Sequence, residues 1–141
     1  MSAFRLEDVI NIIADELNGV FTVRVSSMQN TGHFLNELKA IGSTNLPAVI
    51  ITFSGIDFNS ETMCAEAHLS LVLIDRFHAD SNERAMNLYA SADDLMEFFP
   101  LLGIQIGEAF ITPEGAQAAS VDPNYAAIVL GLRVQQRAAQ T

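Results

Sequence analysis

The sequence has no tryptophan, a single cysteine and no apolar run longer than a β-strand. Because Cys64 is alone, one chain can form neither a disulfide nor a cysteine-based zinc site, and we expect Cys64 to be a small apolar filler beside a strand. A lone cysteine suits a reducing compartment. The apolar runs fall far short of the ~20 residues that a membrane-spanning helix requires, so we expect a soluble protein without a membrane partner.

Basic residues are also scarce, with seven Lys and Arg against 17 Asp and Glu, which gives a formal net charge of −10. Binding to nucleic acid needs clustered cations, so this balance argues against autonomous binding of DNA or RNA. The acidity favours solubility, a basic protein partner, or a wall that repels passing DNA. Acidic Glu7 and Asp8 stand where a secretory signal needs its apolar core, so we expect no export signal.

The common signatures of enzyme chemistry are missing as well. The sequence has no Gly-rich loop followed by Lys, no His-Glu-x-x-His run and no Gly-x-Ser-x-Gly elbow. These motifs would indicate nucleotide binding, a zinc hydrolase or a serine hydrolase. The aromatic residues are mainly Phe and fall at positions expected to face the core, which indicates packing rather than base stacking. We therefore expect no enzyme and no cofactor.

Two dense apolar segments dominate what is present. Residues 46–55 and 65–77 read as two β-strands joined by a polar connection at 55–60. The first is apolar on both faces, which is typical of a strand inside a sheet. The second alternates, with Glu66 and His68 on the face opposite the leucines. With 141 residues, the chain fits one domain over 1–141, whose core would bury about 68–70% of the unfolded surface.

The other segments complete an α+β order. Apolar residues at helical spacing predict a helix at 6–17, and alternation predicts a strand at 21–26. A capping box from Asp80 to Glu83 and the stop at Pro100 bound the longest helix. The remaining expectations are a short helix at 34–41, strands at 104–112 and 125–135, and turns at 113–115 and 122–124 that bracket a short extended segment at 116–121.

The expected order is therefore α-β-α-β-β-α-β-β. Strands joined by short turns favour antiparallel pairing. We predict a two-layer α+β fold with a mainly antiparallel or mixed sheet of about four to six strands and helices packed on one face.

One polar cluster lies between the second central strand and the long helix: Asp75, Arg76, His78 and Asp80. An imidazole beside two carboxylates can hold a divalent ion or transfer a proton. A metal-dependent enzyme using Asp75, His78 and Asp80 is therefore the least favoured alternative. The simpler interpretation is that Asp80 caps the helix, Asp75 pairs with a neighbour and His78 is a solvated loop residue.

Two further polar features have simple interpretations. Glu66 and His68 share a strand face at i and i+2, and they would cooperate in chemistry only if a third group came from elsewhere. A solvated sheet face or a subunit contact is the simpler role. His33 has no charged residues near it in the sequence and carries no argument for catalysis.

Ile56 and Phe58 are apolar residues in the predicted polar connection. A monomer would normally expose such a connection. Two interpretations remain open: these side chains dock on a partner, or they fold back over the core.

Several segments together resemble the Mu-type small tail protein family of contractile-tailed bacteriophages. The resemblance lies in the acidic N-terminal helix, the strand at 46–55 (Leu-Pro-Ala-Val-Ile-Ile-Thr-Phe-Ser-Gly), Leu-Val-Leu-Ile-Asp-Arg at 71–76, Leu88-Tyr89, Leu-Leu-Gly-Ile-Gln-Ile at 101–106 and Tyr-Ala-Ala-Ile-Val-Leu-Gly-Leu-Arg-Val at 125–134. It spans nearly the whole chain, although no single motif is diagnostic.

The resemblance implies a tail terminator or tail completion protein. Such a protein would form a hexameric ring on the head-proximal end of the tail, block further addition of tube and sheath subunits, and bind the head connector or neck proteins. DNA would be a passing cargo. The location would be the bacterial host cytoplasm during assembly, and then the virion or a tail-like particle. Another tail, neck or baseplate component and a cytoplasmic binding module remain as alternatives.

Candidate contact residues for such an assembly are Ile56 and Phe58, together with the rare cations Arg24, Arg76, Arg84 and Arg133. Cations in an acidic chain can pair with carboxylates of a neighbouring subunit. Replacing Arg76 and Arg84 with Glu should impair ring formation and leave the monomer folded.

Overall fold

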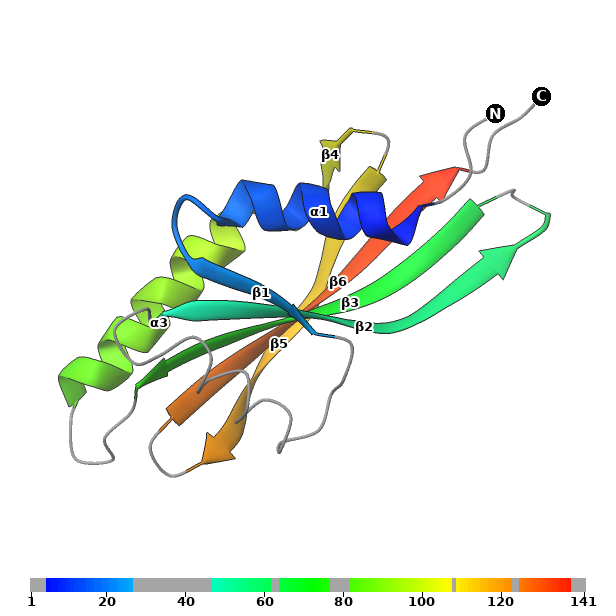
Figure 1. Cartoon of the computed structure of the whole chain (residues 1–141). Helices are drawn as coiled ribbons and strands as arrows, with labels where there is room; N and C mark the ends of the chain where they lie inside the picture. The colour runs from blue at the N-terminus through cyan, green and yellow to red at the C-terminus, as the bar shows by residue number, and fades with distance from the viewer. Residues whose placement is uncertain are drawn as a thin grey trace.

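The computed structural model shows an α+β fold with two helices and a mixed, curled sheet of six strands in the described part of the chain (Figure 1). The described residues are 5–26, 47–61, 64–76, 82–107, 109–122 and 125–137. The predicted helix at 34–41 lies outside them, as do His33, His78 and Asp80.

Helix α1 (Leu6–Leu17) forms over the predicted residues and buries Val9 and Ile13. Glu7 and Asp8 lie in its first turn, where negative charge interacts favourably with the helix dipole. Helix α3 (Asn82–Glu97) ends before Pro100, as predicted.

The described strands have the order β1-β2-β3-β6-β5-β4, and among them only β1 and β2 pair in parallel. β2 lies inside the sheet, as its two apolar faces predict. The strands are β1 (Thr22–Ser26), β2 (Ala48–Asn59), β3 (Cys64–Arg76), β4 (Ile104–Ile106), β5 (Ala109–Asp122) and β6 (Tyr125–Arg137).

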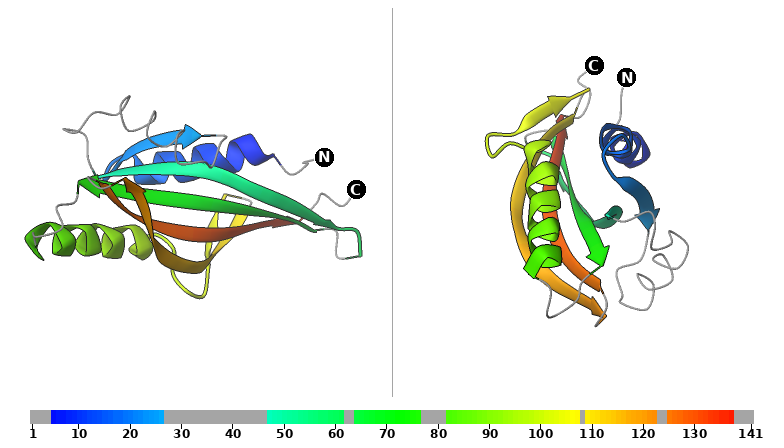
Figure 2. Two further views of the ribbon diagram at one scale, coloured as in Figure 1. Left: turned by 90° about the horizontal axis from the view of Figure 1, so that it is seen from below. Right: turned by 90° about the vertical axis from the view of Figure 1, so that its left-hand side faces the viewer.

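One sheet face carries the core that joins both helices to the sheet. Alternate residues of the central strands, such as Ile51, Leu71 and Leu130, share this face because they lie opposite one another in the register. They form one buried cluster with Ile13 of α1 and Leu95 of α3. Both described helices therefore cover the same face, as predicted. Figure 2 shows α1 beside β1 and α3 towards the opposite margin of the sheet.

The structure corrects three boundaries. The predicted strand at 104–112 is a hairpin of β4 and β5, with Gly107 in a left-handed conformation (φ 60°) between them. The predicted turn at 113–115 and the segment at 116–121 belong to β5, and the predicted connection at 55–60 lies mainly in β2. β-Bulges cause the last two errors, because an extra residue interrupts the alternation within a strand. Three strands rather than two thus follow α3 in the described part.

Candidate functional site

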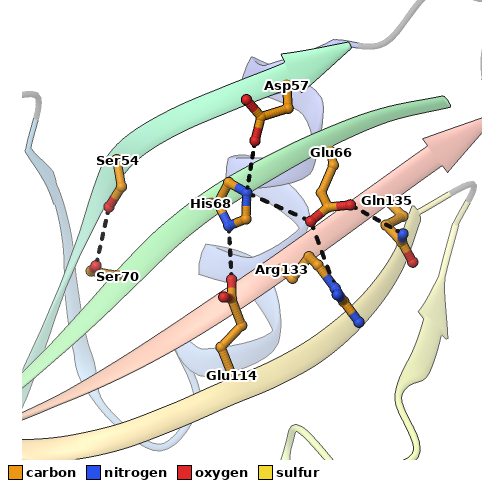
Figure 3. A network of polar contacts seen from close by, with 8 residues as sticks. All are labelled: Ser54, Asp57, Glu66, His68, Ser70, Glu114, Arg133 and Gln135. Atoms are coloured by element: carbon orange, nitrogen blue, oxygen red, sulfur yellow. Dashed lines mark hydrogen bonds and ion pairs between the residues drawn. The ribbon is translucent and has the colours of Figure 1, made fainter. Parts of the chain in front are cut away.

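A network of polar side chains surrounds His68 on the sheet face opposite the core cluster (Figure 3). The imidazole Nδ1 lies 2.8 Å from Oε1 of Glu114, and Nε2 lies 3.2 Å from Oδ2 of Asp57. The carboxylate of Glu66 approaches Nε2 at 3.6 Å. One imidazole thus contacts three carboxylates, which come from β2, β3 and β5.

The strand register and two bulges bring these groups together. Asp57 lies opposite Glu66 in the β2–β3 ladder, two residues from the position opposite His68. Glu114 comes from further away, because β6 separates β3 from β5. The bulge between Pro113 and Gly115 lets Glu114 project onto this face. It crosses β6 beside Gly131, where a Cβ would lie 3.7 Å from the Cβ of Glu114.

The carboxylates set the charge of the imidazole. The pKa of His68 is raised above its usual value, and the hydrogen bond with Glu114 is the largest cause. Partial burial lowers this pKa, whereas the charges of Glu114 and Glu66 and the hydrogen bond with Asp57 raise it further. The arrangement therefore favours the imidazolium, which donates from both nitrogens. With both nitrogens held by carboxylates, neither offers a lone pair for general-base catalysis.

β6 extends the network with Gln135 and Arg133. The Nε2 of Gln135 donates to Oε2 of Glu66 at 3.3 Å, and the Nε of Arg133 lies 3.9 Å from Oε1 of the same carboxylate. That Nε is buried and has no hydrogen-bond acceptor within the described part of the chain. The network thus links four neighbouring strands, and its clearest physical effect is to fix their relative positions.

An open hollow of about 330 Å³ lies next to the network on the same face, lined by residues that include Ser70, Glu114, Gln117 and Gly131. Ser70 shares a hydrogen bond with Ser54 across β3 and β2, with 3.3 Å between the hydroxyl oxygens. In the described ranges, no group of three or more His, Cys, Asp or Glu side chains is placed to hold a metal ion.

The sequence predicted part of this site. Glu66 and His68 do share a strand face, but the sequence pattern predicts a connection at Asp57 and a turn at Glu114, the two groups that complete the network. No local signal identifies them, since Glu114 is 46 residues from His68 in the chain. The polar cluster beyond β3 is only partly described: Asp75 is half-buried near the end of β3.

The predicted contact residues divide into separate groups. Ile56 packs against the core, so folding back holds for this residue, whereas Phe58 is 74% exposed and its docking on a partner stays a prediction. Arg24 is exposed on β1, and Arg133 belongs to the His68 network. Arg76 ends β3 and Arg84 lies in α3, but their side chains lie outside the described part. Among the residues whose side chains are described, Arg24, Phe58 and Arg133 therefore form no single patch.

Large apolar side chains are exposed at several margins of the fold. Leu101 and Leu102, in the turn after α3, are 87% and 92% exposed. Tyr89 is exposed on α3, and Val25 is exposed on β1. Among the described helices, none has the length and apolar character needed to span a membrane.

None of the known protein-family models matches this chain, and neither does any curated protein sequence.

Proposed function

We propose that this chain is a structural subunit of a contractile bacteriophage tail: a tail terminator that forms a hexameric ring on the head-proximal end. The observation that carries the proposal is the exposure of Phe58, Leu101 and Leu102 at separate margins of one subunit. The adjacent residues Leu101 and Leu102 are both almost fully exposed, and a contiguous exposed apolar surface favours contact with another protein. The resemblance of the sequence to small tail proteins supports this kind of assembly.

In the proposed mechanism the ring docks on the last ring of tube and sheath, blocks further addition, and then binds the neck proteins. These steps need shape and stable contacts rather than bond chemistry. The β2–β3 hairpin extends past both helices (Figures 1 and 2) and carries Phe58 near its end. Because Asp57 and Glu66 lie on this hairpin and contact His68, the network supports it as a firm arm for docking.

The net charge of −10 suits a ring through which DNA passes as cargo. Carboxylates along the lumen would repel phosphates and keep the DNA from binding to the wall. This part of the proposal requires acidic residues to face the lumen. An electron-microscopy map of the ring with its acidic side chains on the outer surface would contradict it.

The decisive experiment deletes the gene for this chain in the phage or prophage that encodes it and measures tail length by electron microscopy. We expect tails of variable or excessive length without attached heads, and uniform tails when the wild-type gene is restored. A gold label on the chain should mark the head-proximal end. Uniform, head-joined tails in the deletion would refute the proposal, and a label at the baseplate end would indicate another tail component.

A further inference from the structure

A hollow of about 480 Å³ lies where the C-terminal ends of α1 and α3 approach each other and β4. Figure 1 shows the two helix ends near one another. The exposed residues Glu16 of α1 and Glu97 of α3 form part of its rim. Apolar side chains make up most of the remaining wall: Phe98, Phe99, Ile104 and Ile106.

The two rim carboxylates stand at the ends of helices that would favour cations. Glu16 lies in the last turn of α1, Glu97 is the last residue of α3, and neither last turn contains a basic residue. The C-terminal end of a helix carries partial negative charge, so a cation is stabilising there and a carboxylate is not. Within the described ranges, neither carboxylate forms an ion pair or a side-chain hydrogen bond. Negative charge therefore accumulates at this rim without a described cation to balance it.

The walls of the hollow suit a side chain that is apolar along its stem and cationic at its tip. Phe98 is half-buried and tilted against the buried ring of Phe99, with 6.5 Å between the ring centroids. The stems of Lys and Arg pack on apolar surface of this kind while their charged heads reach polar groups. The faces of aromatic rings also attract cations. An arginine or lysine side chain thus fits both the walls and the rim.

Exposed apolar side chains lie close to the hollow in the chain. The turn that joins Phe99 to Ile104 carries Leu101 and Leu102, which are 87% and 92% exposed. Both ends of this turn line the hollow, so a bound segment that places its cation there would pass near the leucines. Apolar residues on either side of the cation would match this surface.

A different protein is a better source of the cation than a second copy of this chain. The chain has seven basic residues against 17 acidic ones. Arg5 pairs with Asp8 in its own helix. Arg133 and Arg24 also have interactions within the chain. An acidic surface of this kind favours a partner of the opposite charge.

We propose that the hollow between the ends of α1 and α3 binds an arginine or lysine side chain of a partner protein, from a segment in which apolar residues flank the cation. The inference rests on the proposed function for the identity of that partner, which would be a tube, sheath or neck protein. It assigns the docking step of the terminator to one surface of the subunit.

A short peptide tests the hollow without the tail. The probe is Gly-Leu-Arg-Leu-Gly with blocked ends, titrated into isotope-labelled protein while the amide NMR signals of Gln105 and Gly107 are followed. We expect these signals to shift and the affinity to fall as salt screens the charges. Gly-Leu-Gln-Leu-Gly lacks the cation and Gly-Ser-Arg-Ser-Gly lacks the apolar flanks, so both should bind more weakly. Equal binding of either control, or no shift at about 10 mM probe, would overturn the proposal.

Two charge-reversed variants separate contact in the hollow from overall acidity. Glu16→Lys/Glu97→Lys changes the rim, whereas Asp15→Lys/Asp94→Lys changes exposed neighbours that do not line the hollow. Both proteins should stay folded, because cations interact favourably with the C-terminal ends of helices, and circular dichroism checks this. The rim variant should bind the Arg peptide at least about tenfold more weakly than the control variant. Equal affinities would overturn the proposal.

Two other occupants would be recognised by the same measurements. Spermidine that binds as tightly as the Arg peptide would show that charge alone is sufficient, and would overturn a protein segment as the occupant. Self-association of the wild-type chain that disappears in Glu16→Lys/Glu97→Lys and persists in Asp15→Lys/Asp94→Lys would assign the hollow to a second copy, and would overturn the proposal as well.

The tail phenotype separates failure of this contact from failure of the proposed function. A phage with Glu16→Lys/Glu97→Lys should produce tails of uncontrolled length or without heads, and a phage with Asp15→Lys/Asp94→Lys should assemble normally. Normal assembly of the first phage would overturn docking through the hollow and leave the terminator role standing. Uniform, head-joined tails after deletion of the gene would refute the terminator role, and the peptide titration would still decide whether the hollow binds a cation.

Discussion

The imidazole of His68 and the carboxylate of Glu114 meet across an intervening strand, with 2.8 Å between Nδ1 and Oε1. The pair spans β6 above Gly131, a residue with no side chain to obstruct it. It joins β3 to β5, while Asp57 joins the same ring to β2. Charged side chains thus connect β2, β3 and β5 at this point of the sheet, in addition to the backbone hydrogen bonds between neighbouring strands.

This relationship predicts a pH-dependent stability. The pKa of His68 is raised in the folded protein, chiefly by Glu114, so its contribution to the free energy of unfolding is complete below about 6.5, the usual value. The contribution decreases as pH rises through the raised pKa. We expect His68→Gln to lose stability below about pH 6.5 and to flatten the fall in urea midpoint as pH rises above that value.

His33 and His78 remain in both proteins and serve as an internal control for that comparison. Glu114→Gln should lower the pKa of His68 in a proton NMR titration, because it removes the strongest interaction that favours the imidazolium. Equal pH slopes for wild type and His68→Gln would show that the network does not couple protonation to folding.

The regular spacing of apolar residues in the sequence predicted α1, β2 and β3. The 3.6-residue spacing of Val9, Ile13 and Leu17 located α1, and the paired apolar segments located β2 and β3. These signals are local, since each requires only that one face of an element be apolar. They fix which side chains enter the core, and the structure places them there.

The same reasoning failed where the alternation changes phase. The bulge between Phe53 and Gly55 moves Ile56 and Phe58 onto the core face, and the bulge at Glu114 does the same for Ala116. A broken alternation followed by Gly looks like a turn in the sequence, so both strands were interrupted too early. Since the second bulge also places Glu114 beside His68, the polar network depends on the features that periodicity cannot locate.

A pair of leucines near the end of α3 tests the assignment of the core. Leu95 is fully buried, whereas Leu101 is 87% exposed in the following turn. Leu95→Ala should lower the free energy of unfolding by about 2–5 kcal/mol, because it leaves a cavity. Leu101→Ala should change it by no more than about 0.5 kcal/mol. Urea denaturation measures both, and similar losses would contradict the packing of α3.

The two apolar residues of the β2–β3 arm should respond differently to the same change. Ile56→Ser should cost more than about 1 kcal/mol of stability because Ile56 packs against the core. Phe58→Ser should leave stability within about 0.5 kcal/mol of wild type and weaken ring formation or docking on the tail, because Phe58 is 74% exposed. Light scattering and a tail-binding assay provide the readout. Unaltered assembly and binding would remove Phe58 from the contact residues.

The turn after α3 depends on Gly103, which has a φ of 91° and lies against the ring of Phe110. Gly103→Ala adds a Cβ that overlaps this ring and forces a non-glycine residue into the left-handed region, so we expect a loss of about 2–4 kcal/mol. In a Phe110→Ala background the overlap disappears and the loss should fall to about 1 kcal/mol. Gly19→Ala is the matched control, since no atom lies within 4 Å of its added Cβ. Equal losses from Gly103→Ala in both backgrounds would show that the ring does not restrict this turn.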